Sequence, residues 1–116
     1  MVIKDPTNDH VIAARAVEAR SHLSRMRGML GRRFENFDAM VFHKNNSIHM
    51  FFMRIPLDIL FLDKESRVLS LRHSIRPWRM AMHFGAATTI ELPAGVLKEK
   101  GVTPGDQLEI TCDQVL

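Results

Sequence analysis

The sequence contains no tyrosine and one cysteine, and no apolar run reaches the length of a membrane span. A transmembrane helix needs about 20 predominantly apolar residues. Because Cys112 has no second cysteine to pair with, nothing in the chain requires an oxidising compartment. Its alternation with apolar neighbours predicts a small buried side chain. Residues 1–6 lack the apolar segment of a signal peptide. We therefore expect a cytoplasmic protein with no membrane span, although a removed export signal would leave no trace.

Motifs for catalysis and cofactor binding are equally scarce. The serines have no Gly-x-Ser-x-Gly context, and the six glycines are scattered rather than gathered in a phosphate-binding loop. Four histidines invite a metal hypothesis, but their spacing matches no zinc motif; they are His43, His49, His73 and His83. On the predicted strands, His49 and His73 are the pair to check for a meeting in space. The sequence therefore predicts no cofactor and no metal, and it leaves open whether the protein is an enzyme.

The sequence does contain enough apolar material for one core. Of its 116 residues, 46% are hydrophobic and 25% are charged, which is an ordinary globular composition. We expect residues 1–116 to form a single domain. Eight methionines and seven phenylalanines make the apolar side chains adaptable. Methionine-rich surfaces bind partners in some proteins, but core filling is the more common role and the one we expect here.

Basic residues are concentrated in two stretches. Residues 15–33 contain six arginines against one acidic residue, Glu18, and residues 67–79 contain four arginines and no acid. Towards the C-terminus the sign reverses, because aspartates and glutamates outnumber lysines. Such asymmetry is compatible with an anionic partner, whether nucleic acid, phosphate or an acidic peptide. A solvated basic face is the commoner explanation.

Local patterns predict short strands and two short helices. Strands are predicted at residues 39–42, 48–53, 57–62, 68–73, 88–92 and 108–112, and residues 10–17 form a further edge segment that residues 1–4 are expected to join. One helix is predicted after Ser21, with an apolar stripe of Leu23, Met26 and Leu30, and another lies within residues 93–100. Turns are predicted at residues 45–46, 63–66 and 103–106, the last of type II. Residues 75–85 are expected to form a long loop.

These elements arrive in mixed order and without internal repeats, which argues against a βαβ fold. They predict an α+β domain built as a small mixed β-barrel or half-barrel of about six or seven short strands with two short helices. The long loop is expected to lie over the barrel.

A dense apolar run at residues 47–63 carries few polar groups, among them His49, Arg54 and Asp58. Polar groups in apolar surroundings must be paired, or the fold loses stability. Asp58 shares a strand face with two leucines, so its carboxylate is directed at the core. One interpretation is a general base or ligand-anchoring acid with a perturbed pKa. The other, which we favour, is a buried pair with Arg54 or an acceptor for backbone donors around Pro56.

The segment Arg76-Pro77-Trp78-Arg79 is the most distinctive exposed candidate. A rigid proline beside the only tryptophan, with an arginine on each side, is suited to stack a base or sugar while pairing a phosphate or carboxylate. The alternative is that Trp78 plugs the mouth of the barrel while the arginines form salt bridges with acids such as Glu91. If the segment borders a pocket, the lining is expected to consist of Met53, Arg54, Asp58, Trp78 and Met80.

Several blocks, taken in order, resemble one known family. They are residues 27–30 (Arg-Gly-Met-Leu), 39–42 (Ala-Met-Val-Phe), 49–63, 91–95 (Glu-Leu-Pro-Ala-Gly) and 101–106 (Gly-Val-Thr-Pro-Gly-Asp). Over about residues 11–111 the chain is similar to the uncharacterised bacterial and archaeal family known as domain of unknown function 192, or UPF0127. The chain departs from it at Ala39, often glycine in members, and at Phe52, often tryptophan. The resemblance implies a compact, mostly β domain and no established activity; many relatives carry export signals.

Three functional hypotheses follow. The leading one is a small soluble binding or accessory module with a pocket or groove for an anionic small molecule, peptide or partner protein. The second is a hydrolase-like enzyme that uses Asp58 and His49, with or without a metal. The third, less favoured, is a weak nucleic-acid binder that uses the arginine-rich helix. In the leading hypothesis, the ligand-binding residues are Met53, Arg54, Asp58, Arg76, Trp78 and Arg79.

Overall fold

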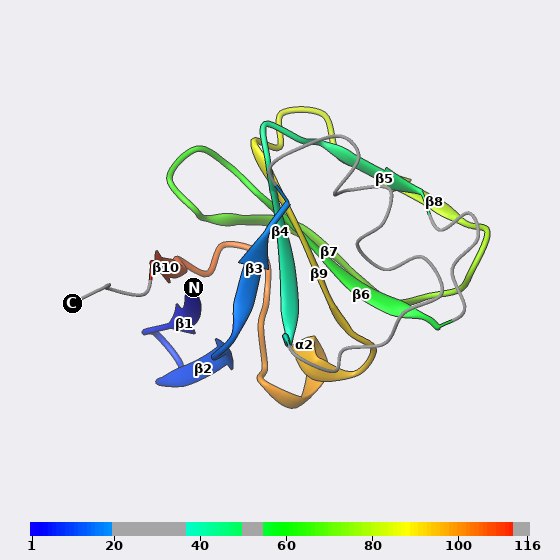
Figure 1. Cartoon of the computed structure of the whole chain (residues 1–116). Helices are drawn as coiled ribbons and strands as arrows, with labels where there is room; N and C mark the ends of the chain where they lie inside the picture. The colour runs from blue at the N-terminus through cyan, green and yellow to red at the C-terminus, as the bar shows by residue number, and fades with distance from the viewer. Residues whose placement is uncertain (20–36, 50–54, 113–116) are drawn as a thin grey trace.

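The computed structural model describes residues 1–19, 37–49 and 55–112 of the chain, and strands dominate this part (Figure 1). The largest sheet has the order β3-β4-β9-β6-β7, with β3 at Ala16–Glu18, β4 at Ala39–His43, β9 at Thr88–Pro93, β6 at Leu57–Leu62 and β7 at Val68–Ile75. A second sheet has the order β10-β1-β2, with β10 at Glu109–Thr111, β1 at Val2–Asp5 and β2 at His10–Ala13. A third pairs β5, Ser47–His49, with β8, Met80–Met82. The helix α2 spans Val96–Glu99.

The fold is therefore mostly β with a short helix, which agrees with the α+β prediction in its coarse form. A closed barrel is not formed by the described residues, because their strands separate into three sheets. Part of this separation into sheets arises within residues 10–17, which were expected to form one segment. The Asp38 carboxylate accepts hydrogen bonds from the backbone N–H groups of Ala14 and Arg15, both at 2.8 Å. These bonds hold a bend, so that β2 pairs with β1 while β3 pairs with β4.

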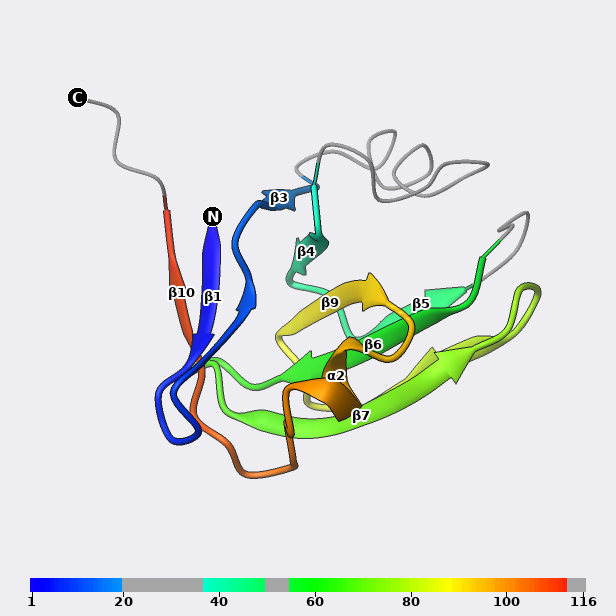
Figure 2. The same cartoon turned by 90° about the horizontal axis from the view of Figure 1, so that it is seen from below.

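The central strand β6 is buried along its whole length, as the continuous apolar run predicts. Its side chains alternate between two clusters. Leu60 and Leu62 belong to the first face of the sheet, which the N-terminal sheet and α2 cover. Leu57, Ile59 and Phe61 belong to the second face. Figure 2 shows α2 lying across the sheet near β9 and β6, with β10, β1 and β2 grouped to one side.

Three local predictions are confirmed by the backbone. Residues 63–66 form a turn between β6 and β7. Asn45 forms a turn in which its side-chain oxygen accepts the Ser47 N–H at 3.0 Å. In the turn at residues 103–106, the Asp106 N–H donates to the Thr103 carbonyl at 3.2 Å, and Gly105 has φ 92°, as a type II turn requires at its third position.

Two expectations are wrong. Residues 75–85 are not one long loop, because β7 extends to Ile75 and residues 80–82 form β8, which pairs with β5. The large apolar side chains of this segment are exposed. The segment therefore lacks the row of buried apolar residues by which a strand is usually recognised in a sequence. Cys112 is exposed rather than buried, because it lies beyond the end of β10. The helix predicted after Ser21 falls outside the described residues.

Candidate functional site

Asp58 has no exposed surface and lies on the first face of the sheet. Its carboxylate accepts three backbone hydrogen bonds, from Ser74 N–H at 2.8 Å, Gly95 N–H at 2.9 Å and Leu97 N–H at 3.0 Å. The prediction of a buried acceptor for backbone donors is therefore confirmed, although the donors come from β7 and the start of α2 rather than from the region of Pro56. A carboxylate bonded in this way fixes three segments relative to one another.

The exposed candidate lies elsewhere, on the strand that the sequence did not predict. Trp78, Met80, Met82 and Phe84 are exposed by 58%, 64%, 49% and 81%, and they are four of the six exposed large hydrophobic residues in the described chain. Met80 and Met82 are alternate residues of β8 and so share a face, while Trp78 and Phe84 lie in the turns on either side of the strand. We call these four residues the apolar row. An exposed apolar cluster of this kind is the usual mark of an interaction surface.

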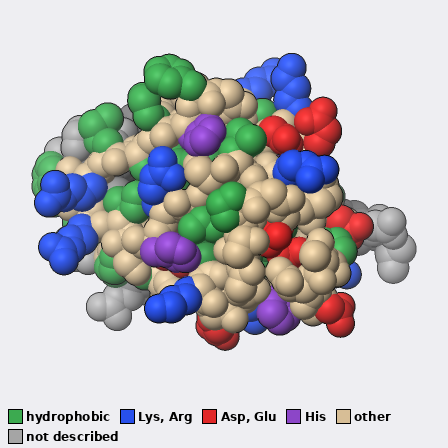
Figure 3. Space-filling view, turned by 180° about the vertical axis from the view of Figure 1, so that it is seen from behind, with side chains coloured by type: hydrophobic (Ala, Val, Ile, Leu, Met, Phe, Trp, Pro, Cys, Tyr) green, Lys and Arg blue, Asp and Glu red, His purple; other side chains and the backbone are tan. Residues whose placement is uncertain are grey.

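Arginines flank the apolar row. Arg76 and Arg79 are exposed, and neither side chain forms an ion pair with a described residue. No acidic residue occurs at residues 66–90, whereas the same stretch contains four arginines. Seen from behind, hydrophobic and Lys or Arg side chains stand out together at the side of the molecule where β5 and β8 lie in Figure 1 (Figure 3). The surface therefore combines apolar contact area with positive charge.

Packing on the other side of the β5–β8 pair, which we call the outer ribbon, explains why the row faces outwards. Ile48 and Ala81 are paired in the ribbon, and both pack against the second face of the large sheet. In an antiparallel pair, opposite residues share a face and their sequence neighbours point the other way. The burial of Ile48 and Ala81 therefore directs Met80 and Met82 away from the core.

Side chains from β7 and the adjoining loop secure the outer ribbon. The Arg72 guanidinium lies 5.6 Å from the ring centroid of Phe61, and it donates to the Met82 carbonyl at 3.5 Å. The Ser70 hydroxyl is 2.7 Å from His83 Nδ1, and the His83 ring also lies near Phe61, with 6.1 Å between ring centroids. The ribbon is thus held to β7 by side chains, whereas β6 and β7 are joined by a backbone ladder.

The six predicted ligand-binding residues are not all brought together. Arg76, Trp78 and Arg79 lie on the exposed surface, whereas the Asp58 carboxylate is directed into the opposite side of the large sheet. Met53 and Arg54 lie outside the described residues. The expectation that Trp78 plugs a barrel mouth is wrong, because more than half of its surface is exposed.

The candidate metal and salt-bridge residues are placed as follows. Glu91 is buried, with Met40 and Ile59 as its register partners, and the described residues contain no ion pair between it and Arg76 or Arg79.

His73 is exposed on β7, and His49 is paired with Met80 in the ribbon. Within the described ranges, no group of three or more histidine, cysteine or acidic residues is arranged to hold a metal ion.

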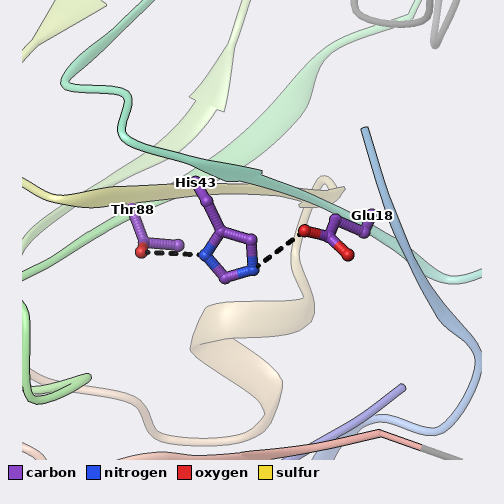
Figure 4. Close-up of polar contacts among 3 residues, drawn as sticks. All are labelled: Glu18, His43 and Thr88. Atoms are coloured by element: carbon purple, nitrogen blue, oxygen red, sulfur yellow. Dashed lines mark hydrogen bonds and ion pairs between the residues drawn. The ribbon is translucent and has the colours of Figure 1, made fainter. Parts of the chain in front are cut away.

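His43 makes a contact that resembles part of a catalytic triad (Figure 4). Its Nε2 lies 3.6 Å from Glu18 Oε1, and its Nδ1 lies 3.5 Å from the Thr88 hydroxyl. A nucleophile and its base usually approach to about 2.6–3.2 Å. Thr88 is buried and is also the register partner of His43 across β4 and β9, which explains their proximity without any catalytic role. We interpret the contact as a link between β3, β4 and β9.

Sequence reasoning missed Met82 and Phe84 as surface residues. The signal was present as the regular spacing of the four residues of the apolar row, but a methionine stripe is more often part of a core. No helix in the described part of the chain is long and apolar enough to cross a membrane.

The fold defines a small strand-rich domain with a short helix and an apolar, basic outer ribbon. The chain belongs to the DUF192 family, described as "Uncharacterized ACR", whose model matches residues 2–110. This confirms the resemblance carried by the blocks between residues 27 and 106. A UPF0127 protein of Thermococcus sibiricus is 34% identical over 110 residues, covering 89% of this chain and 70% of that protein. A UPF0127 protein of Pyrococcus abyssi is 41% identical over 66 residues, and the match covers 56% of each chain.

Two solved structures have similar folds. A protein of unknown function from Novosphingobium aromaticivorans has a TM-score of 0.79 at 24% identity, covering 94% of this chain and 82% of that one. A protein from Sinorhizobium meliloti, whose description proposes a transcription regulator, has a TM-score of 0.72 at 25% identity, covering 81% of this chain and 79% of that one. These likenesses establish the fold and assign no activity to the chain.

Proposed function

We propose that this domain is a protein-binding module that docks an acidic segment of a partner protein along the apolar row. The observation that carries the proposal is the exposure of four large apolar side chains on β8 and the residues beside it, next to two arginines that form no ion pair with a described residue. Charged partners that approach such a surface are steered by complementary charge. The acid-free stretch at residues 66–90 therefore favours a partner that carries acidic residues next to apolar ones.

The shape of the surface favours a protein segment over a small molecule. Small-molecule sites are usually concave and enclose most of the ligand. The apolar row instead lies on the outer side of a two-stranded ribbon, and each of its members is about half exposed or more. An aromatic residue flanked by arginines is also the composition found at the energetic centres of protein interfaces.

The hydrolase alternative receives less support. Both Asp58 carboxylate oxygens accept backbone N–H groups, so the group already has a structural role. Asp58 and His49 lie on different sheets, with Asp58 on β6 and His49 on β5. The nucleic-acid alternative was based on an arginine-rich helix that lies outside the described residues.

Trp78 makes the proposal directly measurable, because it is the only tryptophan in the chain. Residues 78–84 span at most roughly 20 Å at about 3.3 Å per residue of extended chain, so a peptide of about ten residues can cover the row. We would titrate a peptide that alternates glutamate with leucine, and a matched peptide with lysine in place of glutamate, while recording Trp78 fluorescence. The acidic peptide is expected to bind at least about tenfold more tightly at low salt, and less tightly as salt is added.

A charge swap and a matched control complete the test. The Arg76→Glu, Arg79→Glu double variant should prefer the lysine peptide, and Met80→Ser should weaken both peptides. Val11→Ser removes another exposed apolar residue, 44% exposed and on a different sheet, and should change neither affinity. Equal affinity for the two peptides, or tighter binding of a single-stranded oligonucleotide than of the acidic peptide, would overturn the proposal. So would dimerisation by light scattering that is lost with Met80→Ser, because the occupant would then be a second copy.

A further inference from the structure

Asp5 is a second carboxyl group without exposed surface, and it lies far from the apolar row at the end of β1. Its Oδ2 accepts a hydrogen bond from Asn8 Nδ2 at 3.0 Å. Its Oδ1 is buried and has no donor, unlike the oxygens of Asp58. An ionised carboxylate left in this state would be costly, because a buried charge needs hydrogen bonds or an opposite charge.

The neighbouring group is another carboxyl. Asp106 accepts hydrogen bonds from the Thr103 N–H at 3.0 Å and from the Thr103 hydroxyl at 3.1 Å. Asn8 Nδ2 lies 3.4 Å from Asp106 Oδ2 and 3.3 Å from the Gly101 carbonyl, so one amide group connects the two acids. Because Asp106 already accepts from Thr103, it is the member of the pair that is better suited to carry the negative charge.

The direction of each pKa agrees with this assignment. Burial raises the pKa of Asp5, and a hydrogen bond with Asp106 raises it further. Burial also acts to raise the pKa of Asp106, but hydrogen bonds from the Thr103 N–H, from Asp5 and from the Thr103 hydroxyl outweigh it and lower the value. Two acids in contact titrate as a pair that keeps one proton over an extended pH range.

We propose that Asp5 is a protonated carboxylic acid in the folded protein and donates its O–H to the Asp106 carboxylate. This clasp joins the β1–β2 hairpin to the turn at residues 103–106, which are about a hundred residues apart in the sequence. Protonation satisfies the second Asp5 oxygen, which otherwise has no partner. The clasp opens when Asp5 loses its proton, because the buried Asp5 carboxylate then faces the negative charge of the half-buried Asp106.

The pH dependence has a definite sign. Because the folded pKa of Asp5 is raised, its contribution to stability is complete below the unfolded pKa and is lost as pH rises through the folded value. Because the folded pKa of Asp106 is lowered, its contribution is present above the unfolded pKa and is lost as pH falls through the folded value. The clasp is therefore strongest between the two folded pKa values and weakens on both sides.

Other charged groups lie on the elements around the clasp. Glu109 is the register partner of Lys4 across β1 and β10, and both are exposed. His10 Nδ1 lies 2.6 Å from the Lys100 carbonyl oxygen, and Arg67 donates to the Gly105 carbonyl at 3.3 Å. Asp9 lies on the same hairpin, and Lys98, Glu99 and Lys100 lie on or directly after α2.

The test is to titrate the aspartate side-chain carboxyls of the whole chain by carbon-13 NMR. The pKa of Asp5 is expected above the ordinary value of 3.8 and the pKa of Asp106 below it. The chemical shift of each carboxyl should also change at the pH where the other one titrates. In Asp5→Asn, an amide N–H replaces the donated O–H, so the unfolding midpoint should lose part of its dependence on pH. Asp63→Asn, which removes an acid from an exposed turn, is the matched control and should leave that dependence unchanged.

Titration of Asp5 at or below 3.8 would overturn the proposal, and this readout on the unaltered chain remains decisive if Asp5→Asn does not fold. An increase in the unfolding midpoint with calcium or magnesium that Asp5→Asn abolishes would also overturn it, because the pair would then bind a cation instead of sharing a proton.

Discussion

The large sheet is covered on its two faces by different kinds of contact. On the first face, the Asp58 carboxylate accepts three backbone N–H groups and so attaches β7 and the start of α2 to β6. On the second face, the outer ribbon is held by the packing of Ile48 and Ala81 and by side chains such as Arg72. The first attachment therefore depends on one buried side chain that binds backbone donors of two other segments, whereas the second depends on packing and on several side chains.

This difference explains how a buried acid and exposed apolar residues occur in the same small fold. A buried carboxylate is tolerated when its hydrogen-bonding capacity is filled, as it is for Asp58. Exposed apolar side chains gain nothing from folding, because they stay in contact with water. Stability therefore does not explain the composition of the apolar row, and this is the basis of the docking proposal. Substitutions on the two faces should separate these two roles.

The largest effect is expected on the first face. Asp58→Ala leaves three backbone N–H groups without an acceptor, and each unsatisfied buried donor costs about 1 kcal/mol or more. We expect the free energy of unfolding in urea to fall by about 3 kcal/mol. Asp58→Asn keeps one side-chain acceptor and should cost less.

Asp38→Ala is the matched control for Asp58→Ala, since Asp38 also accepts two backbone N–H groups but at a partly exposed bend. Water can replace those bonds, so the loss should be about 1 kcal/mol. Equal losses in the free energy of unfolding for the two variants would show that burial does not increase the contribution of the Asp58 carboxylate to stability.

An intermediate effect is expected where the ribbon meets β7. Arg72→Ala removes the guanidinium that lies on Phe61 and donates to Met82. The free energy of unfolding should fall by about 1 kcal/mol, and the Ala81 N–H should exchange with solvent faster than N–H groups of β6. Arg67→Ala, which removes an exposed arginine that bonds to Gly105, should not change exchange in the ribbon. If Ala81 is equally protected in both variants, side chains of β7 do not secure the ribbon.

The smallest effect on stability is expected in the apolar row. Met80→Ser and Phe84→Ser exchange exposed apolar groups for polar ones, and each should change the free energy of unfolding by less than about 0.5 kcal/mol. A loss of more than about 1 kcal/mol in urea unfolding would show that these side chains support the core, and the docking proposal would lose its basis.

Much of the fold was predictable from local patterns. The continuous apolar residues of β6, the turn at 63–66 and the Pro-Gly pair at 104–105 each carry a short-range signal. The β8 strand was not predictable in this way, because its buried face is the single small residue Ala81 between two exposed methionines. For the candidate site, the exposure of Arg76 and Trp78 agrees with the prediction of an exposed segment, whereas their separation from Asp58 depends on which face of the sheet each residue occupies.

The sequence by itself determined the strand-rich composition, the position of the buried acid and the family, because these follow from the order of apolar, polar and turn residues along the chain. Only the tertiary structure decided which donors meet Asp58, which acid lies beside Asp5 and which side of β8 faces water. These three outcomes depend on contacts between segments that are distant in the sequence, and local residue patterns do not encode the partner of a buried polar group.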